Sequence, residues 1–138
     1  MDKIAIIIIG VIVVVAVIFV GVYLKNPNSP GVSVSPAPLP EGNVLFFGDG
    51  CPHCKNVDDF VVQNNIEEKV PFTRLEIPYG GKTSPELESN AALIAQLAGR
   101  CNIDASNGVG IPFLWDGQNC TVGDEPVINF FKNAAGIQ

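Results

Sequence analysis

The sequence has few basic residues and only one histidine. Eight lysines and arginines stand against fourteen aspartates and glutamates, which gives a formal net charge of −6 at pH 7. Nucleic-acid-binding proteins carry a basic patch or stripe that meets the phosphates, so this charge balance argues against nucleic acid as a partner. Solubility is the simpler meaning of the acidity.

The sequence also lacks a second pair of closely spaced cysteines. Cys51 and Cys54 are three residues apart, whereas Cys101 and Cys120 are distant from them and from each other. A zinc ribbon would need two close pairs, so this kind of site is not expected. The even number of cysteines suits an oxidising compartment without proving one.

Residues 51–54 read Cys-Pro-His-Cys and follow an apolar run and a glycine-rich turn. The four consecutive apolar residues at 44–47 predict a strand that is buried on both faces. Proline suits the first position of a helix, where its missing N–H costs nothing, so a helix is expected to begin at Pro52. The order is therefore a strand, a turn and a helix that opens beside a cysteine.

The sulfur of Cys51 is expected at the N-terminus of this helix, next to unpaired N–H groups and the positive end of the helix dipole. Such a position stabilises a thiolate, which is the nucleophile in disulfide exchange. His53 adds positive charge when it is protonated, and Cys54 is close enough to form a tight ring with Cys51. These residues predict a redox-active dithiol; half of a zinc site or a structural disulfide are the alternatives.

The motif at 51–54 and the strand before it resemble the thioredoxin superfamily, and Cys-Pro-His-Cys is most similar to the periplasmic disulfide oxidoreductases of the DsbA type. The resemblance implies thiol–disulfide exchange with protein substrates, and no cofactor other than the redox-active Cys51–Cys54 disulfide. Cys51 is then the attacking sulfur, and Cys54 resolves the mixed disulfide. Pro52 and His53 complete the catalytic motif, in which His53 and the helix N-terminus hold the Cys51 thiolate.

Turn and capping residues predict the element order β-α-β-α-β-β-α. This order matches a minimal thioredoxin-like α/β fold. Strands are expected at 43–47, 70–77, 111–115 and 120–122, and helices at 52–64, from 85 to about 100 and from 125 to 135.

Pro112 stands near the start of a predicted strand, where a proline needs an edge or a special role because it cannot donate to the ladder. In the thioredoxin superfamily the residue at this position is a cis-proline that faces the dithiol. The resemblance implies that the Ile111–Pro112 bond is cis and that the backbone of both residues docks an extended substrate peptide. An ordinary trans proline on an edge strand is the alternative.

Leu45 departs from the pattern of the superfamily. Its members usually carry a buried carboxylate six residues ahead of the first cysteine, and here that position is Leu45. Without this base, the proton of Cys54 must be exchanged with water or with another group. The departure bears on the rate of disulfide exchange and not on its occurrence.

Cys101 and Cys120 are expected at the end of the second long helix and on the last strand. If both lie at one end of the sheet, a bridge would close a loop of about 20 residues and stabilise the fold by about 3 kcal/mol. The segments around Cys101 and Pro112 resemble thioredoxin domains attached to vitamin K epoxide reductase homologues, which also carry a cysteine near this helix end. A structural disulfide is the first interpretation, and a second redox relay or free thiols are the alternatives.

Residues 4–24 form an uninterrupted apolar run. As a helix of this length they would span about 31 Å, which matches the hydrocarbon core of a bilayer. The nearest small-x-small candidate for cleavage is residues 33–35, and Pro36 after it is a poor residue for cleavage. We therefore expect an uncleaved, single-pass membrane anchor over residues 1–25. The proline-rich residues 26–42 are predicted to be a spacer and residues 43–138 the thioredoxin-like domain.

The sequence as a whole predicts a thiol–disulfide oxidoreductase that is anchored in the cell membrane, with its domain on the extracytoplasmic side. A stabilised Cys51 thiolate favours an oxidase or isomerase over a reductase. A membrane redox partner would recharge the dithiol, by analogy with the vitamin K epoxide reductases. The alternatives are a copper or zinc handling module that uses Cys51, Cys54 and His53, and a redox-inert binding domain.

Overall fold

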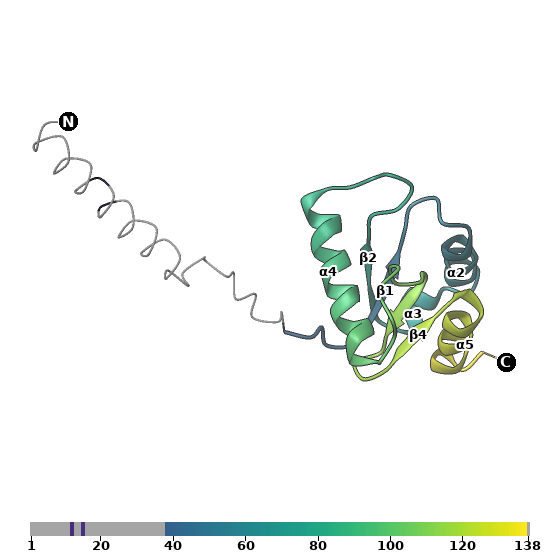
Figure 1. Cartoon of the computed structure of the whole chain (residues 1–138). Coiled ribbons are helices and arrows are strands. Elements are labelled where there is room, and N and C mark those ends of the chain that lie inside the picture. Colours follow the sequence, from purple (N-terminus) through teal and green to yellow (C-terminus); the bar gives the residue numbers. More distant parts are fainter. Residues whose placement is uncertain (1–11, 13–14, 16–37, 138) are drawn as a thin grey trace, which may run out of the picture. The chain divides into compact units, whose positions relative to one another are not determined.

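The computed structural model describes Ile12, Val15 and residues 38–137. Within this part of the chain, a four-stranded sheet lies between helices on both of its faces (Figure 1). The elements are β1 (Asn43–Phe47), α2 (Pro52–Gln63), α3 (Ile66–Lys69), β2 (Phe72–Glu76), α4 (Pro85–Arg100), β3 (Phe113–Trp115), β4 (Cys120–Val122) and α5 (Asp124–Ala135).

The sheet has the strand order β2-β1-β3-β4 and combines parallel with antiparallel pairs. β1 runs parallel to β2, so the chain crosses over between them through α2 and α3. β1 is antiparallel to β3, where Val44 lies opposite Trp115, and β3 is antiparallel to β4, where Trp115 lies opposite Cys120. This mixed α/β architecture is compatible with the predicted thioredoxin-like fold.

The residues of β1 alternate between two hydrophobic cores, because successive side chains of a strand point to opposite faces of the sheet. Val44 and Phe46 belong to the core beneath α4, and Leu45 belongs to the core beneath α2, α3 and α5. All three are at most 2% exposed. The prediction of a strand buried on both faces is confirmed.

The long helices begin and end where the capping residues predict. α2 begins at Pro52, and α4 begins at Pro85 after Ser84, whose hydroxyl accepts a hydrogen bond from the Leu87 N–H at 3.2 Å. α5 ends at Gly136, which has a φ of +67°. Proline at a first helical position and glycine after the last one serve these functions because of their backbone preferences.

The sequence did not predict α3, and the second and third strands are shorter than expected. Asn65 has a φ of +50° and ends the turn after α2, after which Ile66–Lys69 forms one helical turn. Ile66 is the one buried residue of this turn, so no apolar periodicity marks it. β2 therefore begins at Phe72 and not at residue 70.

The predicted membrane anchor lies outside the described residues, apart from Ile12 and Val15. Among the residues that are described, no helix is both long enough and apolar enough to cross a bilayer. The anchor over residues 1–25 stays a prediction.

The last residues of the predicted spacer contact the domain. Leu39 packs against the core beneath α4, and the indole Nε1 of Trp115 donates a hydrogen bond to the carbonyl of Pro40 at 3.0 Å. Trp115 is only 1% exposed, so this bond satisfies a buried donor. The packed structure therefore begins a few residues before the predicted boundary at Asn43.

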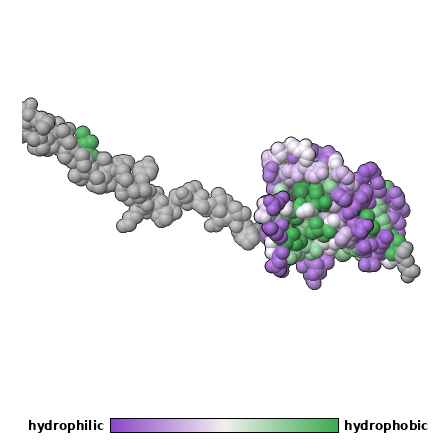
Figure 2. All heavy atoms as spheres, turned by 45° about the vertical axis from the view of Figure 1, so that its right-hand side comes forward, coloured by the Kyte–Doolittle hydropathy of each residue, from purple (hydrophilic) through white to green (hydrophobic). Residues whose placement is uncertain are grey.

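On the face of the domain drawn in Figure 2, hydrophobic residues gather near the centre and hydrophilic residues surround them. A groove of about 560 Å³ runs between α4 and the loop that leads to β3, and most of its lining is apolar. Tyr79 and Ile111 belong to this lining.

Candidate active site

The Cys-Pro-His-Cys motif lies where β1 passes through a short turn into α2. The Cys51 N–H donates a hydrogen bond to the Gly48 carbonyl at 3.1 Å, which closes the turn. Cys51 caps the helix, and its sulfur accepts a hydrogen bond from the Cys54 N–H at 3.2 Å. The sulfur therefore lies at the helix N-terminus, as the position of Pro52 predicts.

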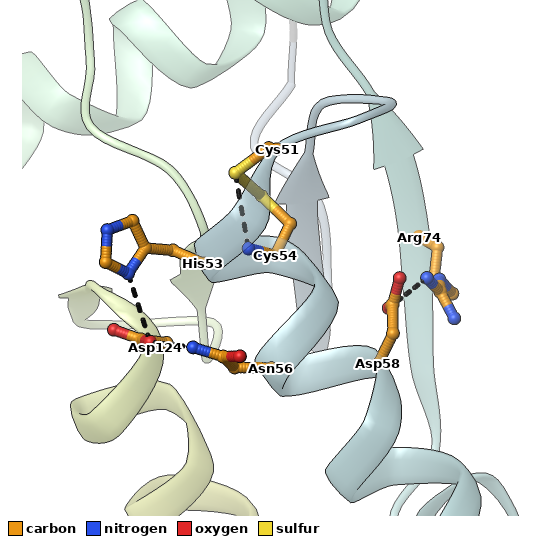
Figure 3. Close-up of a disulfide and its surroundings, with 7 residues drawn as sticks. All are labelled: Cys51, His53, Cys54, Asn56, Asp58, Arg74 and Asp124. Carbon is orange, nitrogen blue, oxygen red and sulfur yellow. Dashed lines mark hydrogen bonds and ion pairs between the residues drawn. A yellow bond between two sulfur atoms is a disulfide. The ribbon is translucent and has the colours of Figure 1, made fainter.

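Cys51 and Cys54 form a disulfide, with their Cα atoms 5.3 Å apart (Figure 3). Cys51 is 5% exposed and Cys54 is 3% exposed, while Pro52 and His53 between them are exposed. Both cysteines line a cavity of about 450 Å³. Its other lining residues are Phe47, Gly48, Asp49, Gly50, Pro52, Lys55 and Asp58.

The hydrogen-bond partner of His53 is Asp124, in the first turn of α5. The Asp124 carboxylate accepts from Nδ1 of His53 at 3.1 Å and from Nδ2 of Asn56 at 2.6 Å (Figure 3). The Asn56 hydrogen bond, and then that of His53, lower the pKa of Asp124 to about 2. An ionised carboxylate only accepts hydrogen bonds, so Nδ1 of His53 carries the proton. The predicted role of His53 at the Cys51 thiolate would therefore act through its charge.

The opposite side of α2 carries a second pair of charges. Asp58 of α2 forms an ion pair with Arg74 of β2 (Figure 3). The Arg74 guanidinium stacks 5.0 Å from the centre of the Phe47 ring, and Glu67 of α3 approaches it at 3.8 Å. Sequence reasoning missed both Asp58 and Asp124, because their partners are 16 and 71 residues distant.

The Ile111–Pro112 peptide bond is cis, as the resemblance implies. Pro112 is buried, and its carbonyl accepts a hydrogen bond from the Gly123 N–H at 2.9 Å. A Cβ atom on Gly48 would lie 2.9 Å from Cδ1 of Ile111 and 2.6 Å from Cβ of Tyr79. The segment before β3 thus packs directly on the turn that carries Cys51.

Cys101 and Cys120 form the second disulfide, with their Cα atoms 6.1 Å apart. The predicted pairing is confirmed. Cys101 follows the last residue of α4, and Cys120 lies opposite Trp115, near the beginning of β1. Cys51 follows the end of β1, so the two disulfides lie at opposite ends of the sheet.

Leu45 is 1% exposed and packs in the core beneath α2. Within the described part of the chain, no polar or charged residue is buried. In residues 38–137 there is also no group of three His, Cys, Asp or Glu side chains that could hold a metal ion. The site is thus a cysteine pair whose charged neighbours lie at its rim.

Comparisons of the chain with protein-family models, with curated proteins and with solved structures found no match.

Proposed function

We propose that the protein is a membrane-anchored, extracytoplasmic thiol–disulfide oxidoreductase that exchanges disulfides with protein substrates through Cys51 and Cys54. The observation that carries the proposal is the Cys51–Cys54 disulfide at the start of α2, beside a cavity of about 450 Å³. A purely structural bridge has no need of a helix N-terminus, whereas an exchanging cysteine does, because this position stabilises its thiolate.

In the proposed reaction a substrate thiolate attacks the Cys51 sulfur. The Cys51–Cys54 bond breaks, a mixed disulfide forms, and Cys54 leaves as a thiolate that takes up a proton. A second substrate thiolate then attacks the substrate sulfur of the mixed disulfide and releases reduced Cys51. The substrate leaves oxidised, and the enzyme keeps the two electrons as a dithiol.

Two features support the direction of an oxidase or isomerase. The hydrogen bond from the Cys54 N–H and the dipole of α2 both favour negative charge on the Cys51 sulfur. Interactions that stabilise the reduced form make the disulfide a stronger oxidant. His53 adds to this effect when it is protonated.

The apolar run at 4–24 supports the membrane anchor, and the chemistry of the site supports an extracytoplasmic location, where disulfides persist. Ile111 and Pro112 are the proposed substrate-docking residues, since Ile111 packs on the Cys51 turn and Pro112 follows it. A membrane redox partner that reoxidises the dithiol completes the proposal.

The reduction potential of the Cys51–Cys54 pair tests the function. The full-length protein in detergent is equilibrated in graded glutathione buffers and its thiols are trapped, with Cys101 and Cys120 scored separately by peptide mass. A potential near −120 mV would indicate a disulfide donor, and one near −270 mV a reductant. Exchange should be abolished in Cys51→Ala. A pair that shows no reversible exchange, but binds copper or zinc when reduced, would replace this proposal with a metal-handling role.

A further inference from the structure

Disulfide exchange requires a proton acceptor for Cys54, and the core beneath the motif supplies none. Cys54 is 3% exposed, and burial in apolar surroundings raises the pKa of a thiol. Leu45 of β1 is apolar and buried, and among residues 38–137 no charged residue is buried. A carboxylate that accepts this proton must therefore come from the rim of the site.

Asp58 is the carboxylate that lies one helical turn after Cys54. The two residues are four apart in α2 and so share one face of the helix. Both line the same cavity of about 450 Å³, together with Cys51. A cavity of this size has room for water between the carboxylate and the sulfur.

Arg74 holds Asp58 in this position. Its guanidinium forms the ion pair with the carboxylate and stacks at 5.0 Å over Phe47, which also lines the cavity. The side chains of Arg74 and Asp58 are 31% and 36% exposed, so the pair lies at the edge of the domain, where solvent can reach it. Figure 3 shows the pair on the side of α2 away from His53.

We propose that Asp58 exchanges the proton of Cys54 through water in this cavity. Asp58 would thereby take the role of the carboxylate that the thioredoxin superfamily usually carries at the position of Leu45. Arg74 is the positioning residue of this arrangement. The inference rests on the proposed thiol–disulfide exchange, in which Asp58 would be the group that exchanges a proton with the buried Cys54 sulfur.

The proton transfer accompanies closure of the Cys51–Cys54 ring. Asp58 accepts the proton of the Cys54 thiol through a water molecule, and the Cys54 sulfur attacks the Cys51 sulfur of the mixed disulfide. The Cys51–Cys54 bond forms as the bond between Cys51 and the substrate breaks, and the electron pair leaves on the substrate sulfur. The Asp58 proton then passes to that sulfur or to solvent. In the reverse direction Asp58 returns the proton to Cys54.

Asp49 also lines the cavity, and like Asp58 it has a cationic partner. On α2, Lys55 pairs with Asp59 at 2.6 Å. On the turn before the helix, Asp49 lies 3.3 Å from Lys82, which Glu76 holds more closely at 2.8 Å. Glu67 is the remaining acid on this side and approaches Arg74 at 3.8 Å. Asp58 is thus the carboxylate of α2 that lines the cavity with Cys54.

The test is the rate of ring closure in Asp58→Asn, with Asp59→Asn as the matched control. The reduced full-length protein is mixed with oxidised glutathione and quenched with acid at intervals, and the mixed disulfide and the closed disulfide are counted by mass. General bases typically contribute 10²–10⁴-fold, and a relay through water delivers less. We expect Asp58→Asn to close at least about tenfold more slowly at pH 6 and Asp59→Asn to match the unmodified protein.

The pH profile separates proton transfer from a structural effect. Below the ordinary thiol pKa of about 8.5, closure in Asp58→Asn should slow by about tenfold per pH unit, since hydroxide becomes the acceptor. The unmodified protein should show a flatter profile, and the two rates should converge near pH 9.5. Added acetate should accelerate an Asp58→Ala variant at pH 6, and Arg74→Gln should show a smaller form of the same defect.

Overlapping profiles for Asp58→Asn and the unmodified protein would overturn the inference, and so would a deficit that is equal at all pH values and unaffected by acetate. In both cases the unmodified protein still exchanges disulfides, and the proposed function stands. An unmodified protein that forms no mixed disulfide at all would instead refute the proposed function.

Discussion

Nδ1 of His53 lies 3.1 Å from the Asp124 carboxylate, which ties the residue between the two cysteines to the first turn of α5. Asn56 donates to the same carboxylate oxygen, so two side chains of α2 meet one acid of α5. The N-terminal end of α2 is therefore held by the helix beside it as well as by its own turn.

Replacing Asp124 by Asn should make the free energy of unfolding less dependent on pH between pH 5 and pH 2. The folded protein holds the pKa of Asp124 at about 2, below its unfolded value of 3.8. The stabilisation is therefore present above about pH 4 and is lost as the pH falls through 2. Urea unfolding between pH 5 and pH 2 should show a shallower decline in Asp124→Asn, whereas Glu125→Gln, a neighbouring exposed acid, should follow the unmodified protein.

Replacing Gly48 by Ala should damage both stability and exchange. The new Cβ would meet Tyr79 at 2.6 Å and Ile111 at 2.9 Å, and both belong to segments packed on the Cys51 turn. We expect a loss of about 1 to 3 kcal/mol and slower reaction of Cys51. Gly99→Ala in α4 is the control, because the new Cβ would meet nothing within 4 Å. This substitution should stabilise the helix by up to about 1 kcal/mol. Equal effects of both substitutions would contradict the close approach at Gly48.

Removing the second disulfide should lower stability without altering the redox chemistry. Cys101 and Cys120 are 19 residues apart in sequence, and a bridge over such a loop contributes about 3 kcal/mol. The double variant Cys101→Ala with Cys120→Ala should unfold at lower denaturant concentration. Its Cys51–Cys54 potential should stay within error of the original value; a shift of 30 mV or more would show that the two disulfides are coupled.

Removing the residues before β1 should lower stability, because Trp115 would lose its hydrogen-bond partner. A fragment that begins at Pro38 keeps the hydrogen bond from Trp115 to the Pro40 carbonyl, whereas one that begins at Asn43 loses it. A buried donor without a partner costs about 1 to 3 kcal/mol. The shorter fragment should unfold earlier, with a change in the fluorescence of Trp115, the one tryptophan of the chain. Identical unfolding of the two fragments would place the boundary at β1.

Placing a carboxylate at residue 45 should destabilise this fold. Leu45 is 1% exposed among apolar neighbours, so a Leu45→Asp side chain would have no charged partner. Burial should raise the pKa of the new carboxyl, and the loss, about 3 kcal/mol or more, should be larger at pH 8 than at pH 5. Denaturant unfolding at pH 5 and pH 8 measures the loss of stability at each pH. A Leu45→Asn variant, which has no ionisable group at this position, should lose the same stability at both pH values.

The main helices and strands followed from local signals in the sequence. Pro52 and Pro85 mark the first turns of α2 and α4, and Gly136 marks the end of α5, because each residue restricts or frees the backbone at its own position. α3 gave no such signal, since a single turn with one buried residue has no periodicity. Local sequence patterns thus predict a helix only where its periodicity extends over several turns or a capping residue marks one of its ends.

The site was less predictable than the fold. The motif itself places Cys51 and Cys54 together, and the cis bond at Pro112 was expected only because of a family resemblance. The partners of His53 and Asp58 depend on how α5 and β2 pack beside α2. Nothing near these residues in sequence indicates Asp124 or Arg74, so only the tertiary structure identifies them.

The opposite placement of the two disulfides would protect the Cys101–Cys120 bridge from the chemistry proposed for Cys51. Exchange between them would need one sulfur to touch another, yet the strand between Val44 and Phe47 alone spans about 10 Å. A reactive Cys51 thiolate therefore cannot scramble the Cys101–Cys120 bridge within one molecule. Under the proposed function, the domain would pass through many cycles of oxidation and reduction at one end while its cross-link at the other end stays intact.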